Sequence, residues 1–178
     1  DQQRMQMNDL ERKEEFARRN VEMLSRSEKG VSQVKVEMSD ALNQLAVTQR
    51  LQNKQEEAVK TLSRSIALDD QPKASAEKVI GDLSKDLVQN NKFEEAIALQ
   101  LNLLSAADST KNELLKINTL TQLGMLYAQQ KMDTAAERNL LAAYQLATSL
   151  HLTKPAKDAL LQLVDLYNNT GRQAKAQQ

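Results

Sequence analysis

The chain has 178 residues, enough to bury a substantial core. Its 24 basic and 24 acidic side chains cancel, which argues against nucleic acid as the main partner, because phosphate binding needs a local excess of Lys and Arg. With no Cys and one His, disulfides and thiolate zinc sites are excluded, and a His-based metal site or catalytic triad has little material. No apolar run approaches the roughly 20 residues of a membrane span, so no membrane insertion of this segment is expected.

The N-terminal stretch 3–29 contains neither Pro nor Gly, and its apolar residues keep to one helical face at Met7, Leu10, Ala17, Val21 and Leu24. We predict one long helix over residues 1–30, ended by Gly30 as the glycine that follows a helix.

Two features of this N-terminal stretch leave alternatives open. Val21 with residues 24–27 resembles Val59 with residues 62–65, so a degenerate helical pair is the other interpretation. Met5, Met7 and Met23 fit core filling better than an adaptable binding face, because Met at helical spacing more often packs inside.

Residues 31–178 carry an internal repeat. The segment 53–59 returns at 91–97, and Ala58 and Ala96 lie 96 minus 58, or 38, residues apart; Ala136 and Ala176 follow at steps of 40. Apolar spacing predicts helices at roughly 31–52, 54–69, 74–90, 92–107, 111–130, 134–151 and 155–169, with another beginning near 173. Paired, they give repeat units of about 31–70, 73–109, 111–152 and 155–178.

The breaks between these helices carry residues that are typical of helix starts. A capping side chain followed three residues later by Glu occurs four times, at Asn53-x-x-Glu56, Asn91-x-x-Glu94, Thr110-x-x-Glu113 and Thr134-x-x-Glu137. Pro72 and Pro155 fall where a new helix begins, since the missing N–H costs little there.

One family has these residue types at these offsets. Leu123-Gly124 with Tyr127, followed by Ala136, Leu140 and Ala143, resembles the tetratricopeptide repeat (TPR), and the resemblance covers about residues 39–178. It implies an all-α fold, a right-handed superhelical array of antiparallel helix hairpins, in other words a TPR-like α-solenoid. The chain departs from the family in its Trp position, held by Leu120 and Leu160, and in a unit longer than the usual 34 residues.

The resemblance also implies where a ligand binds, on first-helix side chains along the inner curve. The offsets that the family uses fall on polar, mostly amide residues: Asn43, Arg50, Lys78, Lys85, Gln89, Asn118, Gln122, Gln129, Gln162 and Asn169. Amides and a few cations suit an extended peptide backbone or carboxylates. That these residues are only exposed polar side chains is the alternative.

The sequence contains no residue pattern that indicates catalysis. His151 stands near a helix C-terminus, where the helix dipole favours it. The carboxylate pairs Glu14-Glu15, Glu56-Glu57, Asp69-Asp70 and Glu94-Glu95 fit solvated faces and helix ends better than acid/base chemistry. We therefore expect a protein that is not an enzyme and needs no cofactor or metal.

The leading hypothesis is a scaffold that binds a protein or peptide along a concave face. The alternative is an extracytoplasmic signal-input (sensor) domain of a larger membrane-bound signalling protein. The first residue, Asp1, and the polar final residues resemble cut edges, which favours an extracytoplasmic or periplasmic location over the cytoplasm. A homodimer is open.

Overall fold

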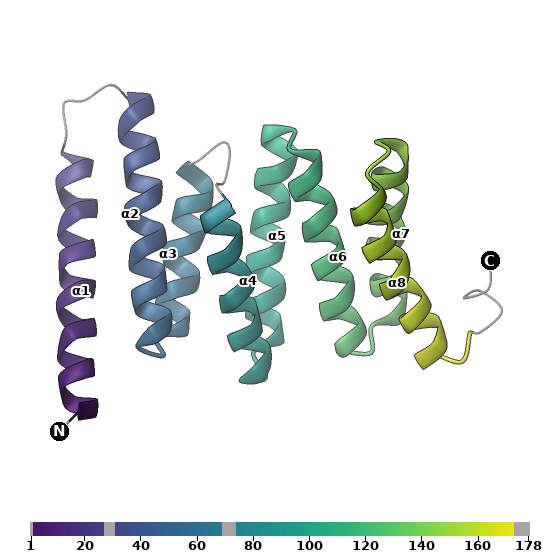
Figure 1. Ribbon diagram of the computed structural model, residues 1–178, viewed down its shortest axis with the longest axis horizontal. Coiled ribbons are helices and arrows are strands. Elements are labelled where there is room, and N and C mark those ends of the chain that lie inside the picture. The colour runs from purple at the N-terminus through teal and green to yellow at the C-terminus, as the bar shows by residue number, and fades with distance from the viewer. Residues whose placement is uncertain (1, 27–30, 69–73, 173–178) are drawn as a thin grey trace. The chain divides into compact units, whose positions relative to one another are not determined.

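The computed structural model describes residues 2–26, 31–68 and 74–172, which form eight α-helices and no strand (Figure 1). The expected all-α fold is therefore confirmed. The chain divides into two compact units, residues 1–95 and 96–178, with the boundary near the start of the fifth helix.

The helices agree with the expected ranges to within a few residues. Unit 1 holds α1 (Gln2–Ser25), α2 (Val31–Leu51), α3 (Gln55–Leu68) and α4 (Ala74–Gln89). After α5 (Phe93–Thr110), unit 2 continues with α6 (Glu113–Gln129), α7 (Asp133–Ser149) and α8 (Thr153–Asn169). The N-terminal stretch is one helix. Gly30, Pro72, the Asp69-Asp70 pair and the helix expected near 173 lie outside the described residues.

In unit 1, α2 is the central helix and packs against α1, α3 and α4. The α2–α3 hairpin buries Leu42, Leu45, Ala58 and Leu62, of which Leu42, Ala58 and Leu62 are fully buried. Because the side chain at residue 58 ends at Cβ, the two helix backbones can approach closely at that crossing.

Polar side chains are also buried inside the α2–α3 hairpin. Ser65 Oγ donates a hydrogen bond of 2.7 Å to Asn43 Oδ1 and lies 2.9 Å from Ser39 Oγ. Thr61 Oγ1 donates to Gln49 Oε1 at 2.8 Å. These bonds hold the register between the two helices and satisfy polar groups that water does not reach.

In unit 2, α7 packs against both α6 and α8. Its small residues Ala136, Ala143 and Ala147 are fully buried, and small side chains at a helix crossing let the two helix backbones approach closely. At Gly124 of α6, an added Cβ would lie 2.4 Å from Leu140 Cγ. The glycine is therefore required by the packing of α6 on α7.

The turns between helices differ from the expectation. Six helices are followed by a residue with positive φ. The backbone N–H of that residue and the N–H of the next residue both donate to carbonyl groups of the last helical turn, which is a Schellman-type arrangement. The positive-φ residues are Asn53, Asn91, Lys111, Lys131, His151 and Gly171. For example, Lys54 N–H donates to Gln49 O at 2.8 Å and Asn53 N–H donates to Arg50 O at 2.9 Å.

The four expected helix-start caps were therefore wrong. Asn53 and Asn91 terminate the preceding helix, Thr110 lies in the last turn of α5, and Thr134 lies inside α7. A side-chain cap is present at Asn112, whose Oδ1 accepts from Leu115 N–H at 3.1 Å. Pro155 lies in the first turn of α8, as expected for a proline at the start of a helix.

Candidate partner-binding surface

In unit 2, the expected binding residues lie on α6 and α8, which contact each other. Asn118, Gln122 and Gln129 on α6 and Asn169 on α8 are exposed, and Gln162 is half-buried. Since 162 minus 122 equals 40, Gln122 and Gln162 are equivalent positions of adjacent units, and Gln129 corresponds to Asn169 in the same way. We call these five residues the amide stripe.

The amide stripe lies opposite the buried side of its helices. On α6, Leu115, Leu123 and Leu126 face the core, which leaves the amides to solvent. Within the described part of the chain, the amide-stripe side chains make no hydrogen bond or ion pair. Their donors and acceptors are therefore available to a ligand, and the stripe itself carries no net charge.

In unit 1, the residues with the same register lie on α4. Lys78, Lys85 and Gln89 are exposed, and no hydrogen bond or ion pair of theirs is found among residues 31–68 and 74–95. Asp82 shares this face of α4, so the surface of unit 1 is charged where that of unit 2 is made of amides.

Two of the ten expected residues have internal roles. Asn43 is 6% exposed and accepts the hydrogen bond from Ser65, so it is part of the α2–α3 packing and does not face solvent. Arg50 Nη1 donates to Asp86 Oδ2 at 2.9 Å, and its Nη2 lies 3.8 Å from Asp82 Oδ2. Arg50 thereby ties α2 to α4. Neither side chain is offered to a ligand, and we leave both out of the binding surface.

Of the three carboxylate pairs within the described residues, two lie at helix ends. Glu56, Glu57, Glu94 and Glu95 lie in the first turns of α3 and α5, where the helix dipole favours negative charge. Glu14 was expected on a solvated face but is buried. Its carboxylate lies 2.6 Å from Lys54 Nζ and 2.6 Å from an Arg18 nitrogen.

The environment of Glu14 sets its ionisation. Burial by itself raises the pKa of Glu14, but the hydrogen bonds from Lys54 and Arg18 outweigh burial, and the net pKa is lowered. Glu14 belongs to α1, and Lys54 lies in the turn between α2 and α3. Their ion pair therefore attaches α1 to the α2–α3 turn. A paired structural charge explains this group without catalysis.

In unit 2, Tyr167 of α8 donates a hydrogen bond of 3.0 Å to Glu137 Oε1 of α7, and Arg172 pairs with the other oxygen at 2.6 Å. Burial and the bond to Glu137 raise the pKa of Tyr167.

His151 is exposed at the turn that follows α7. In the described residues, no group of three or more Asp, Glu or His side chains is placed to hold a metal ion.

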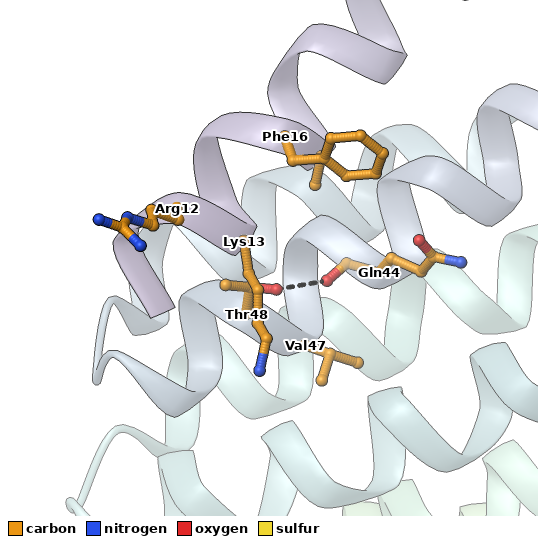
Figure 2. A pocket seen from close by; sticks show the side chains of 7 residues that line it. Arg12, Lys13, Phe16, Gln44, Val47 and Thr48 are labelled. Carbon is orange, nitrogen blue, oxygen red and sulfur yellow. Dashed lines mark hydrogen bonds between the residues drawn. The ribbon is translucent and has the colours of Figure 1, made fainter. Parts of the chain in front are cut away.

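Sequence reasoning missed a groove between α1 and α2. A hollow of about 450 Å³ is lined by Arg12, Lys13 and Phe16 of α1 and by Gln44, Val47 and Thr48 of α2, and Figure 2 shows these side chains gathered around it. A second hollow of about 490 Å³ continues the groove past Gln44 to Met23 and Asp40.

The two side chains that mark this groove are apolar and exposed. Phe16 and Met23 are each 65% exposed, so the expectation that Met23 fills the core was wrong, as it was for the exposed Met7. The signal in the sequence was Phe16, an aromatic residue in a polar stretch that lies off the apolar face formed by Leu10, Ala17 and Leu24.

The comparisons with known proteins concern the fold. No protein-family model matches the chain, and no curated protein matches it. Among solved structures, the chain is similar to BtubC (BKLC) from P. vanneervenii, with a TM-score of 0.64 and 16% sequence identity over 98% of this chain and 71% of that chain. At this identity the likeness supports a shared helical fold only. Across the described helices, none is both long and apolar enough to cross a membrane.

Proposed function

We propose that the chain is a TPR-like helical repeat protein that acts as a non-catalytic scaffold and binds a protein or peptide along the first helices of its hairpins. The observation that carries this proposal is the amide stripe: five amide side chains on α6 and α8, four of them in repeat register, without partners in the described residues.

The chemistry of the stripe favours an extended peptide as the ligand. Each amide presents both a donor and an acceptor, which matches the alternating N–H and C=O groups of a peptide backbone. Because the stripe carries no charge, we expect binding to depend only weakly on salt. The exposed Leu114 at the start of α6 lies one turn before Asn118 and offers an apolar contact at one end.

The binding experiment starts from a display library of unstructured peptides, from which the tightest binder is synthesised. Its dissociation constant is then measured by calorimetry for the parent and for the double variant Gln122→Ala with Gln129→Ala. Two lost hydrogen bonds predict a dissociation constant about tenfold or more higher. Gln145→Ala, which removes an exposed amide from α7, is the matched control and should bind like the parent.

Two results would count against the scaffold proposal. If the selection yields no binding peptide, the proposal that the chain binds peptides is refuted. If a selected peptide binds the stripe variant as tightly as the parent, the amide stripe is not the binding site. The fold part has its own test: a right-handed superhelical array is elongated, so small-angle scattering extrapolated to zero concentration should give a radius of gyration clearly above about 16 Å, the value for a globular protein of this length.

A further inference from the structure

Helix α1 is attached to unit 1 from one side. Within the described part of unit 1, α1 packs against α2 alone, whereas α2 and α3 each pack against two or more helices. Over residues 6–26, Ala17 is buried and the other apolar side chains are half-buried or exposed. The shorter helix α3 buries Ala58, Leu62 and Ile66. Because the hydrophobic effect scales with the apolar area that is buried, α1 is held more weakly than α3.

A buried hydrogen bond between charged groups supplies a second attachment of α1. The Glu14 side chain is 5% exposed, and its Oε2 accepts a hydrogen bond of 2.6 Å from Lys54 Nζ. The other oxygen, Oε1, accepts from Arg18, which belongs to α1 itself and so contributes nothing to the attachment. The Glu14–Lys54 bond therefore breaks whenever α1 leaves α2, while the bonds from Arg18 remain.

The interactions that support α1 as a helix do not depend on α2. Four ion pairs with a spacing of four residues lie within α1, and both members of each pair belong to that helix: Asp9–Lys13, Glu14–Arg18, Glu15–Arg19 and Glu22–Arg26. Detachment of α1 therefore breaks only its contact with α2 and the bond to Lys54. Unfolding of unit 1 also breaks the α2–α3 hairpin with its fully buried Leu42 and Leu62, so detachment requires less free energy.

We propose that α1 is a releasable strap, which detaches from α2 as one helix while the rest of unit 1 stays folded, and that the Glu14–Lys54 bond is the latch that sets how often it does so. Release uncovers the side of α2 that lies along α1, where the buried residues Ala41 and Thr48 line the α1–α2 groove. The strap thereby controls access to α2. This inference goes beyond peptide binding, because the amide stripe lies on α6 and α8, and it is tested without any peptide.

The first test is hydrogen exchange of single amides in the parent chain, at urea concentrations below the unfolding transition. Amides in the middle of α1 should share one opening, exchange about tenfold or more faster than the slowest amides of α3, and respond weakly to urea, because release exposes little surface. Exchange of α1 at the rate and urea dependence of α3 would mean that α1 opens only when unit 1 unfolds, which overturns the strap. Rates that rise gradually toward the ends of α1 would indicate fraying and would also overturn it.

The second test is thiol labelling, which reports detachment directly because the chain has no cysteine of its own. Residue 17 is buried, so Ala17→Cys should react with a maleimide when α1 is detached. Ser65→Cys places a thiol inside the α2–α3 hairpin and is the control, since residue 65 is also buried. Ala17→Cys should react about tenfold or more faster than Ser65→Cys. Equal rates would overturn the strap.

The latch has a matched pair of variants, because Glu14 and Glu15 each pair with an Arg four residues later but Glu14 is the one that bonds to Lys54. In the Ala17→Cys background, Glu14→Gln should speed labelling by about tenfold, since a charge-assisted hydrogen bond becomes a weaker one. Glu15→Gln removes an exposed ion pair and should change the rate by about twofold at most.

A double-mutant cycle connects the two members of the latch. Lys54→Gln should also speed labelling of Ala17→Cys, and Glu14→Gln combined with Lys54→Gln should fall well short of the product of the two single effects, because both remove the same bond. Independent effects that multiply would show that these side chains do not act through each other. Equal effects of Glu14→Gln and Glu15→Gln would mean that helix stability sets the release, and either result overturns the latch.

Discussion

Replacement of Gly124 by Ala tests whether the close approach of α6 and α7 is a packing requirement. A Cβ on residue 124 would lie 2.4 Å from Leu140 Cγ and 2.7 Å from its Cδ2, and Leu140 is buried. Gly81, which also lies inside a helix, has no heavy atom within 4 Å of the same position and is therefore a matched control.

The magnitudes follow from two opposing effects. Ala is favoured over Gly inside a helix by about 1 kcal/mol, so Gly81→Ala should raise the free energy of unfolding by about that amount. Overpacking of a buried contact costs about 1–3 kcal/mol. The two effects oppose each other at residue 124, and Gly124→Ala should lower the free energy of unfolding by about 0–2 kcal/mol.

Urea unfolding followed by circular dichroism gives both free energies. A double-mutant cycle then assigns the cause: Leu140→Ala removes the two closest atoms and leaves Ala136 O at 3.3 Å, so in that background Gly124→Ala should become stabilising by up to about 1 kcal/mol, the gain expected for Gly81→Ala. If Gly124→Ala in the parent stabilised the protein as much as Gly81→Ala does, the packing argument would be refuted.

Three further predictions concern single contacts. Lys131→Gly should stabilise unit 2 by about 0.5–1 kcal/mol in the same urea assay, since glycine adopts positive φ without strain; a loss of stability would contradict this account of the turn. Ser65→Ala leaves Asn43 Oδ1 without its donor and should cost about 1–3 kcal/mol, whereas an unchanged unfolding midpoint would mean that the buried bond contributes nothing. Because the pKa of Glu14 is lowered by its bonds, mainly from Lys54, the stability it contributes is present at neutral pH and is lost as the pH falls through that lowered pKa. Glu14→Gln should therefore flatten the acid limb of the stability–pH curve, and a parent-like limb would show that this carboxylate is not responsible.

The helices could be predicted from sequence because apolar spacing reports the buried face directly. The turns could not, because the same residue type serves two purposes between consecutive helices. Asn is favoured both as the first cap of a helix and as the left-handed residue that ends one, so Asn53 and Asn91 fit either role. The better signal was the spacing of the turn positions: Asn91, Lys111, Lys131 and His151 follow one another at steps of 20 residues, whatever side chain they carry.

The exposed residues of the candidate binding surface were predictable to the extent that a polar residue opposite a buried one faces solvent. Gln122 and Gln129 follow that rule on α6. Asn43 breaks it because Ser65, 22 residues away, supplies a hydrogen bond inside the hairpin. Arg50 breaks it because Asp86 lies on the neighbouring helix. Both exceptions depend on pairs that only the packed hairpins bring together, so helical spacing within one helix could not reveal them.

In the N-terminal helix α1, helical spacing also failed to predict which apolar side chains are exposed. Four ion pairs at a spacing of four residues run along α1 between Asp9 and Arg26, and they support the helix in water without burial of a wide apolar face. Ala17 on the expected inner face is buried against unit 1, which already accounts for the attachment of α1 to α2. Phe16 and Met23 contribute to neither the ion pairs nor that attachment. Both side chains therefore stay exposed beside the α1–α2 groove, although α1 is already attached to α2.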